Sequence, residues 1–173
     1  MAKLGPGDGS IKVYTKREGM AARVGHDLTL QAGRWDADVD LGGEDLSSCS
    51  VTATIDAGSL EVVSGAGGAQ PLSEKDKADI KKNIAKALAG QITFRSTACE
   101  ASGDSRVQVT GDLTIGGSTQ PVTLDLSRSG ERVSGRVTIR QTQWGIKPYS
   151  GLMGALKVSD PVDIELDLRV PQS

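Results

Sequence analysis

Strict alternation of apolar and polar residues is the dominant pattern along this chain. In the C-terminal run PVDIELDLRV, charged residues fill every position between the apolar ones, which are Val162, Ile164, Leu166, Leu168 and Val170. A period of two predicts a strand with one face in a core and one face in water. The same alternation recurs in RWDADVDL, which begins at Arg34, and in VTATIDA, which begins at Val51.

Weaker alternation continues through most of the remaining chain. It occurs in IKVYT, QITFRS, RVQVTGDLTI, PVTLDL, RVSGRVTI and ALKVS, and glycine-containing turns such as Gly116-Gly117 and Ser129-Gly130 separate several of these runs. About eight short amphipathic strands at such spacing predict an all-β fold, an antiparallel sheet that closes into a barrel or folds into a two-sheet sandwich. Small residues on the expected inward faces would leave room inside a barrel for a ligand; they are Ala37, Ala53, Ala57 and Ala98.

One segment, LSEKDKADIKKNIAKALAG, has a helical period instead. Its apolar stripe consists of Ile80, Ile84, Ala87 and Leu88. The pattern predicts one helix over residues 74–89, packed against the sheet or across an opening of it. Ser73 and Asp76 have the spacing of a capping box, and Gly90 is suited to end the helix. With no internal repeat or interdomain linker, we expect one domain over residues 1–173 with its core at about 10–171.

Composition removes several classes of function. The 173-residue chain has a formal net charge of −2 and dispersed basic residues, so no nucleic-acid partner is expected. No window approaches the roughly 18 consecutive apolar residues of a membrane span. The N-terminal MAKLGPGDGS lacks the apolar core of a secretion signal, so we expect a cytoplasmic protein, or a secreted or periplasmic one if a leader has been removed. No cofactor is expected.

Cys49 and Cys99 stand at the edges of the strand-like runs CSVTATID and QITFRSTAC. Two cysteines are too few for a disulfide framework or a four-cysteine zinc site. If the two strands pair antiparallel, the sulfurs can meet, and a disulfide closing so long a loop could contribute roughly 4 kcal/mol to stability. The alternative is a pair of small packed thiols, as expected in a reducing cytoplasm.

His26, the single histidine, is followed directly by Asp27. A histidine beside an acid suggests a catalytic base or a metal ligand. Adjacent residues of a strand point to opposite faces, however, so this pair is not expected to act as a dyad. The chain has no G-x-S-x-G nucleophile motif, and one His with two Cys lacks a ligand for zinc. We therefore expect no catalytic residue and no metal site, and His26 to be a polar residue in or near the barrel interior.

Several stretches taken together resemble the YceI-like family. They are VGHDLTLQAGRW from Val24, ITFRSTA from Ile92, VTGDLTIGGSTQPVTLDL from Val109, IRQTQWGI from Ile139 and GALKVSDPVDIELDLRV from Gly154. The resemblance implies a lipocalin-like antiparallel β-barrel of about eight strands with one helix against it. It also implies an apolar tunnel for a polyisoprenoid or another long-chain lipid, and a homodimer.

The resemblance places four residues near the cavity or its mouth: His26, Phe94, Arg140 and Trp144. The apolar pattern adds five more expected ligand contacts, Leu28, Leu30, Tyr149, Leu152 and Met153, the last three in the apolar segment KPYSGLMGAL. The expected function is a carrier or sequestering protein for a polyisoprenoid or fatty-acyl lipid. Two alternatives remain open. One is a small enzyme that uses His26 as its base, and the other is an interaction module with a fully packed barrel.

Overall fold

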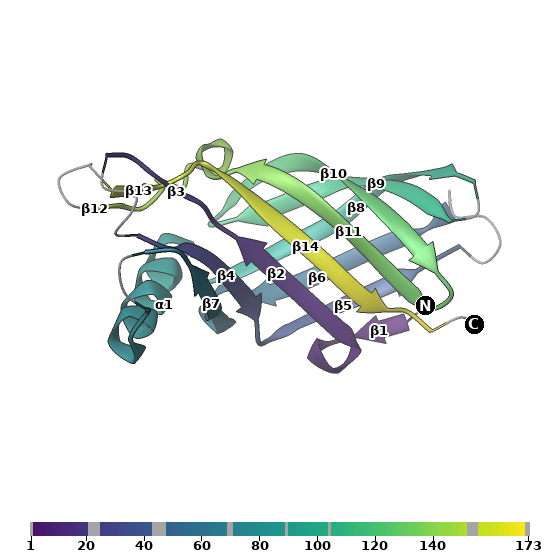
Figure 1. Cartoon of the computed structure of the whole chain (residues 1–173). Helices are drawn as coiled ribbons and strands as arrows, with labels where there is room; N and C mark the ends of the chain where they lie inside the picture. Colours follow the sequence, from purple (N-terminus) through teal and green to yellow (C-terminus); the bar gives the residue numbers. More distant parts are fainter. Residues whose placement is uncertain are drawn as a thin grey trace.

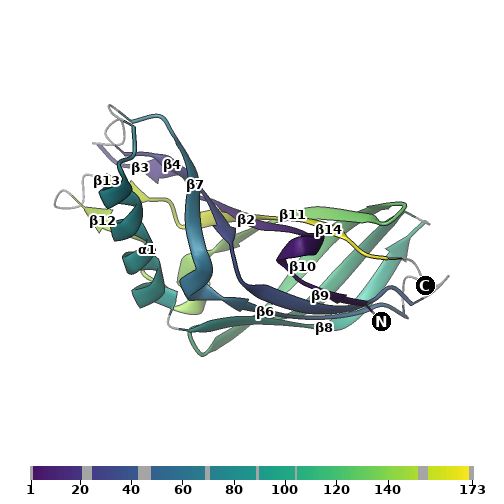
Figure 2. The same cartoon turned by 90° about the horizontal axis from the view of Figure 1, so that it is seen from below.

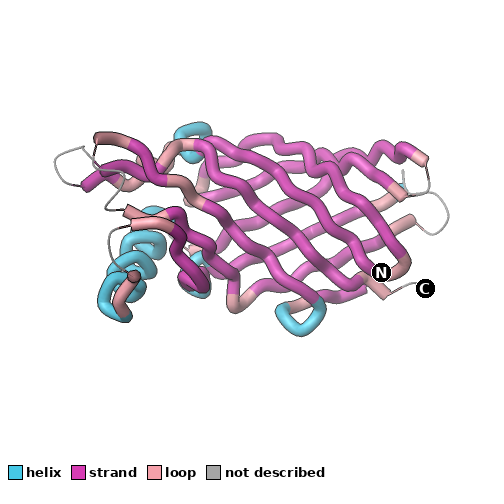
Figure 3. Tube along the Cα trace, viewed as in Figure 1, coloured by secondary structure: helices cyan, strands magenta, loops and turns pink. Residues whose placement is uncertain are grey.

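A computed structural model describes residues 2–20, 25–42, 48–68, 71–88, 90–103, 105–151 and 156–171. It consists of a large antiparallel sheet, a small second sheet and one α-helix (Figures 1 and 3). The strands of the large sheet are β1 (Ala2–Leu4), β2 (Gly9–Tyr14), β4 (Asp27–Ala32), β5 (Trp35–Asp40), β6 (Ser50–Asp56), β7 (Leu60–Ala66), β8 (Gln91–Ser102), β9 (Arg106–Ile115), β10 (Ser118–Ser129), β11 (Arg132–Arg140) and β14 (Pro161–Arg169). The small sheet contains β3 (Arg17–Glu18), β12 (Ser150–Gly151) and β13 (Leu156–Val158), and the helix is α1 (Glu74–Leu88). Short 3₁₀ turns are η1 (Pro6–Asp8), η4 (Ala57–Ser59) and η5 (Gln141–Trp144).

The large sheet has eleven strands in the order β1-β5-β6-β8-β9-β10-β11-β14-β2-β4-β7. It curls around a concave face, and its two edge strands are not hydrogen-bonded to each other, so the sheet forms a half-barrel (Figure 2). The prediction of an all-β, lipocalin-like antiparallel fold is confirmed. The structure has more strands than the expected eight, and several of them, such as β1, β3 and β12, have three residues or fewer and are too short to show a period of two.

Alternation correctly identified most inward faces. In β5, Trp35, Ala37 and Val39 are buried, whereas Asp36 is exposed. In the β14 segment, Val162 and Val170 are buried, and the apolar residues between them pack against the core. Hydrophobic burial along alternate positions therefore fixes the register of these strands.

Ala98 does not follow that pattern, and its expected inward position is wrong. Strict alternation puts it on the same face as the buried Phe94, but Ala98 is exposed. The register between β8 and β9 shifts between Ser96 and Ala98. A bulge of this kind inserts one residue and reverses the facing of those that follow. Cys99, rather than Ala98, consequently packs against the core.

Helix α1 agrees with the predicted bounds within the described residues and begins with the predicted capping box. The Ser73 backbone N–H donates to Asp76 Oδ2 at 3.1 Å, and the Asp76 N–H donates to Ser73 Oγ at 3.0 Å. Ile84 and Leu88 pack against the core, although Ala87 of the expected stripe is exposed. Figure 2 shows α1 beside β7, across one end of the concave face. The helix therefore covers an end of the half-barrel.

Within the described part of the chain, no helix has the length and apolar character needed to cross a membrane.

Candidate functional site

The half-barrel has two different ends. Because neighbouring strands are antiparallel, the start of β8 lies beside the ends of β9 and β6, next to α1. The other end carries both chain termini, which lie close together in Figure 1. We call these the helix end and the termini end. The apolar cavity described below lies at the termini end, and the expected ligand contacts that the structure describes do not line it.

Phe94 and Trp144 lie in one buried cluster, together with Leu113, toward the helix end. Trp144, only 3% exposed, follows β11 in η5. Its indole Nε1–H donates to the backbone carbonyl of Leu113 at 2.8 Å. The polar atom of this ring is thereby satisfied, and the ring itself joins η5 to β9.

Asp160, in the bend just before β14, holds η5 in place. Its two carboxylate oxygens accept from the Thr142 backbone N–H at 2.8 Å and from the Thr142 hydroxyl at 2.6 Å. Two hydrogen bonds lower the pKa of Asp160. The one from the Thr142 hydroxyl has the larger effect, and the one from the Thr142 backbone N–H the smaller. Hydrogen bonds to the charged form favour ionisation. The turn that carries Trp144 therefore depends on an ionised Asp160.

This dependence predicts a contribution of Asp160 to stability against acid. Since its folded-state pKa is lowered, the contribution is complete above the ordinary Asp pKa of about 3.9 and is lost as the pH falls through the lower folded-state value. As the pH is lowered from about 5 to about 2.5, we expect the melting temperature of Asp160→Asn to fall less than that of the native chain. Thermal unfolding followed by circular dichroism measures the difference. Asp79→Asn, on the exposed face of α1, is the matched control. If the melting temperatures of the native chain and Asp160→Asn fell equally with acid, the stabilising role of ionised Asp160 would be contradicted.

His26 lies at the helix end, immediately before β4. A Cβ placed on Gly68 would be 2.5 Å from His26 Nε2, and Gly68 has φ +79°, so only glycine fits there without strain. Leu28 is half-buried and Leu30 is buried in the strand that follows. The imidazole is thus packed between the end of β7 and the start of β4.

Arg17 and Asp27 link the segments around His26 by hydrogen bonds. Arg17 Nη1 donates to the carbonyls of Gly25 at 2.7 Å and Ala66 at 3.0 Å. Asp27 Oδ1 accepts from the Arg17 backbone N–H at 2.9 Å. The Asp27 carboxylate is therefore turned to Arg17 of β3 and helps to join the small sheet to β4.

The remaining predicted contacts are dispersed. Arg140 is exposed at the end of β11, and Tyr149 is 52% exposed before β12. Leu152 and Met153 lie outside the described residues. The structure therefore brings Phe94 and Trp144 into one cluster and leaves Arg140 and Tyr149 on the surface. The ligand contacts assigned to all nine residues remain predictions.

An apolar cavity of about 60 Å³ lies at the termini end. Its walls are valines and leucines from β5, β6, β9, β10, β11 and β14, with Ser127 and Arg128 at its margin. None of the expected ligand contacts that the structure describes lines it. Alternation had indicated that these side chains point inward, but no local pattern indicates which end of a barrel stays hollow.

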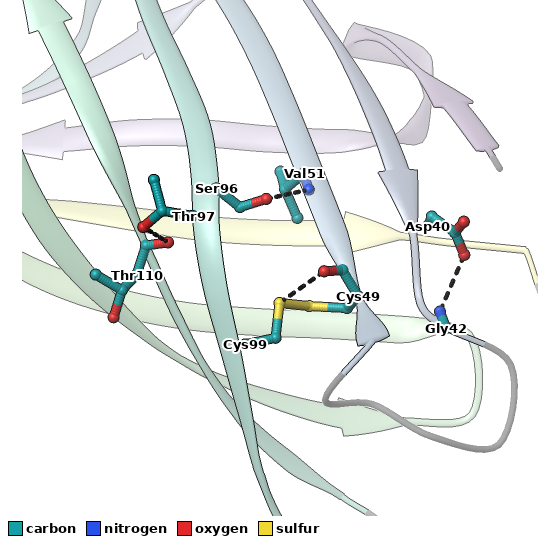
Figure 4. The surroundings of a disulfide bond; sticks show 8 residues. All are labelled: Asp40, Gly42, Cys49, Val51, Ser96, Thr97, Cys99 and Thr110. Atoms are coloured by element: carbon teal, nitrogen blue, oxygen red, sulfur yellow. Dashed lines mark hydrogen bonds between the residues drawn. A yellow bond between two sulfur atoms is a disulfide. The ribbon is translucent and has the colours of Figure 1, made fainter.

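The two cysteines form a disulfide beside this cavity, which settles the alternative left open by the sequence. Cys49, just before β6, is bonded to Cys99 of β8, and Cys49 also lines the cavity (Figure 4). The Val51 backbone N–H donates to Ser96 Oγ at 2.9 Å next to the bond. The disulfide joins the neighbouring strands β6 and β8 at the termini end.

A second hollow, of about 270 Å³, lies on the outside between the β4–β5 corner, η4 and α1. Its charges are already paired: Arg34 with Asp56 at 3.1 Å and Lys81 with Glu61 at 2.7 Å. Exposed pairs of this kind contribute little energy. This hollow offers no unbalanced charge for a ligand, so the apolar interior is the better candidate site.

Comparison with known proteins agrees with this architecture. The family model of the YceI-like domain matches residues 11–170, and the chain therefore belongs to the YceI-like family. The crystal structure of Burkholderia cenocepacia BcnA is similar, with a TM-score of 0.65 and 21% sequence identity over 93% of this chain and 96% of that chain. A Campylobacter jejuni YCEI protein has a TM-score of 0.53 and 16% identity over 82% of this chain and 81% of that chain. At these identities the two structures share the fold with this chain. No curated protein sequence matches it.

Proposed function

We propose that this protein binds a long-chain apolar lipid, of the polyisoprenoid or fatty-acyl type, inside the half-barrel and acts as its carrier or sequestering protein. The observation that supports it most is the continuous apolar interior, made of two core clusters that share partly buried residues such as Ala53, together with an apolar cavity at one end. Membership of the YceI-like family, whose resemblance implies a lipid tunnel, points the same way. The driving force is apolar burial, at about 25 cal/mol for each Å² removed from water.

Binding a long chain requires the interior to widen. The cavity of about 60 Å³ is well below the ~300–1,000 Å³ of ordinary ligand pockets. The edge strands β1 and β7 are not paired with each other, so the sheet can uncurl without breaking a hydrogen-bonded ladder. Ala53, at the middle of β6, packs against both core clusters, and a larger side chain there would occupy the space the ligand needs.

Substituting Ala53→Phe tests this proposal. With cis-parinaric acid as a fluorescent probe, we expect the native chain to bind and Ala53→Phe to bind at least about tenfold more weakly, because the ring fills the interior. Thr52→Phe is the matched control, since Thr52 is exposed on the opposite face of the same strand. Circular dichroism establishes that each variant is folded. Absence of binding by the native chain, to this acid and to a polyprenol, would refute the proposal.

The disulfide also bears on the compartment. Disulfides persist in oxidising environments and are rare in the cytosol. We therefore propose an oxidising compartment in place of the cytoplasm expected from the N-terminal residues.

The homodimer implied by the family resemblance stays a prediction. Size-exclusion chromatography with light scattering tests it.

A further inference from the structure

Trp35 contains a buried hydrogen-bond donor that no described residue satisfies. The residue begins β5, faces the interior and is only 4% exposed. Its indole Nε1 is buried, and no described residue accepts a hydrogen bond from it. Buried tryptophan N–H groups ordinarily have a partner, and an unpaired one destabilises the folded state.

The other tryptophan shows that this fold can satisfy an indole. Trp144 Nε1 donates to the Leu113 carbonyl at 2.8 Å, whereas Trp35 Nε1 has no such carbonyl. Both rings are buried to nearly the same extent, at 3% and 4% exposure. The difference between them is therefore the acceptor and not the depth of burial.

The surroundings of Trp35 connect it to the cavity. Its core cluster includes Val39, Val133 and Val170, and these three valines also line the apolar cavity at the termini end. The other buried members of this cluster are Leu4, Ile11, Ala32, Ala37 and Leu60, all apolar. Trp35 pairs with Ile55 toward the helix end, so a chain that extends from the cavity along this cluster toward Trp35 would meet the unpaired donor.

We propose that Trp35 Nε1–H is the internal recognition point for an uncharged oxygen of the lipid, such as an ester, ketone or ether oxygen. An N–H donor selects an acceptor. A carboxylate or phosphate would be buried in this cluster without a cation, which is costly, so a neutral oxygen fits better. The inference rests on the proposed lipid-binding function and narrows its ligand class to lipids with a neutral oxygen within the buried part of the molecule.

The test compares methyl palmitate with n-octadecane, both delivered from the same cyclodextrin, on the native chain, Trp35→Phe and Tyr14→Phe. We expect the native chain to prefer the ester about tenfold, because the ester satisfies a buried donor that the alkane leaves unpaired. Trp35→Phe keeps an aromatic ring but removes the indole N–H donor, so it should lose this preference. Tyr14→Phe, which removes a donor already paired with Glu165, should keep it. In ¹⁵N-edited NMR, the Trp35 indole signal of the native chain should move downfield with the ester and not with the alkane.

The outcomes separate the two proposals. If neither lipid binds the native chain, the lipid-binding function fails. If both bind with equal affinity, or if Trp35→Phe retains the preference for the ester, lipid binding stands and the role of Trp35 is wrong.

Discussion

Replacing Cys49 and Cys99 together with serine is expected to lower the free energy of unfolding by about 4 kcal/mol. The bond joins residues separated by 50 positions, so it restricts a long loop in the unfolded chain. In the loop-entropy description, the loss of that restriction favours the unfolded state. Guanidinium unfolding under non-reducing conditions, followed by circular dichroism, measures the change.

Reductant provides the control. Adding dithiothreitol should bring the native chain to the stability of the double-serine variant and should leave the variant unchanged. A double-alanine variant separates loss of the bond from the cost of placing two hydroxyls at these half-buried positions. Equal stability of the native chain with and without reductant would contradict a stabilising disulfide.

Replacing Trp144 with alanine is expected to cost about 3–5 kcal/mol through the cavity alone. The ring fills the centre of a buried cluster, and its N–H is the partner of the Leu113 carbonyl. The carbonyl would lose that partner, which adds to the cost. Chemical unfolding of the variant should therefore show one of the largest losses of any single substitution in this chain.

Trp144→Phe divides this loss into its parts. It retains part of the apolar contact but removes the hydrogen bond and some buried ring volume, so we expect a loss of at least about 1–2 kcal/mol, smaller than that of Trp144→Ala. Tyr149→Ala, at a half-exposed aromatic position, should cost less than either. A Trp144→Ala variant as stable as Tyr149→Ala would show that η5 does not hold the core together.

Local patterns predicted most of the fold because the physics that decides it is local. In β5 and β14 the alternation of apolar and charged residues is strict, so one face must be buried whatever the neighbours are. The start of α1 was predictable for a similar reason, since Ser73 and Asp76 satisfy the first backbone N–H groups within one turn. Very short strands such as β3 acquire their pairing from distant residues and leave no period to detect.

The site depends on long-range geometry, and there the sequence was less informative. The bulge after Ser96 decides that Cys99 faces inward and Ala98 outward, and nothing in QITFRSTAC reveals it. Whether the cysteines meet depends on β6 lying beside β8, which cannot be deduced from either run alone. The cavity is lined by strands far apart in the sequence, such as β5 and β11, so no local pattern indicates where it lies. The missing acceptor of Trp35 is likewise visible only once all of its neighbours are in place.

Native mass spectrometry of the protein purified without detergent tests the central claim most directly. We expect, besides the bare chain of 18.0 kDa, a complex heavier by the mass of one long-chain lipid, which organic extraction releases for identification. Ala53→Phe should give the bare mass alone, and Thr52→Phe should retain the lipid. A native chain that has only its bare mass, also after incubation with fatty acids, fatty-acyl esters and polyprenols, would contradict the account.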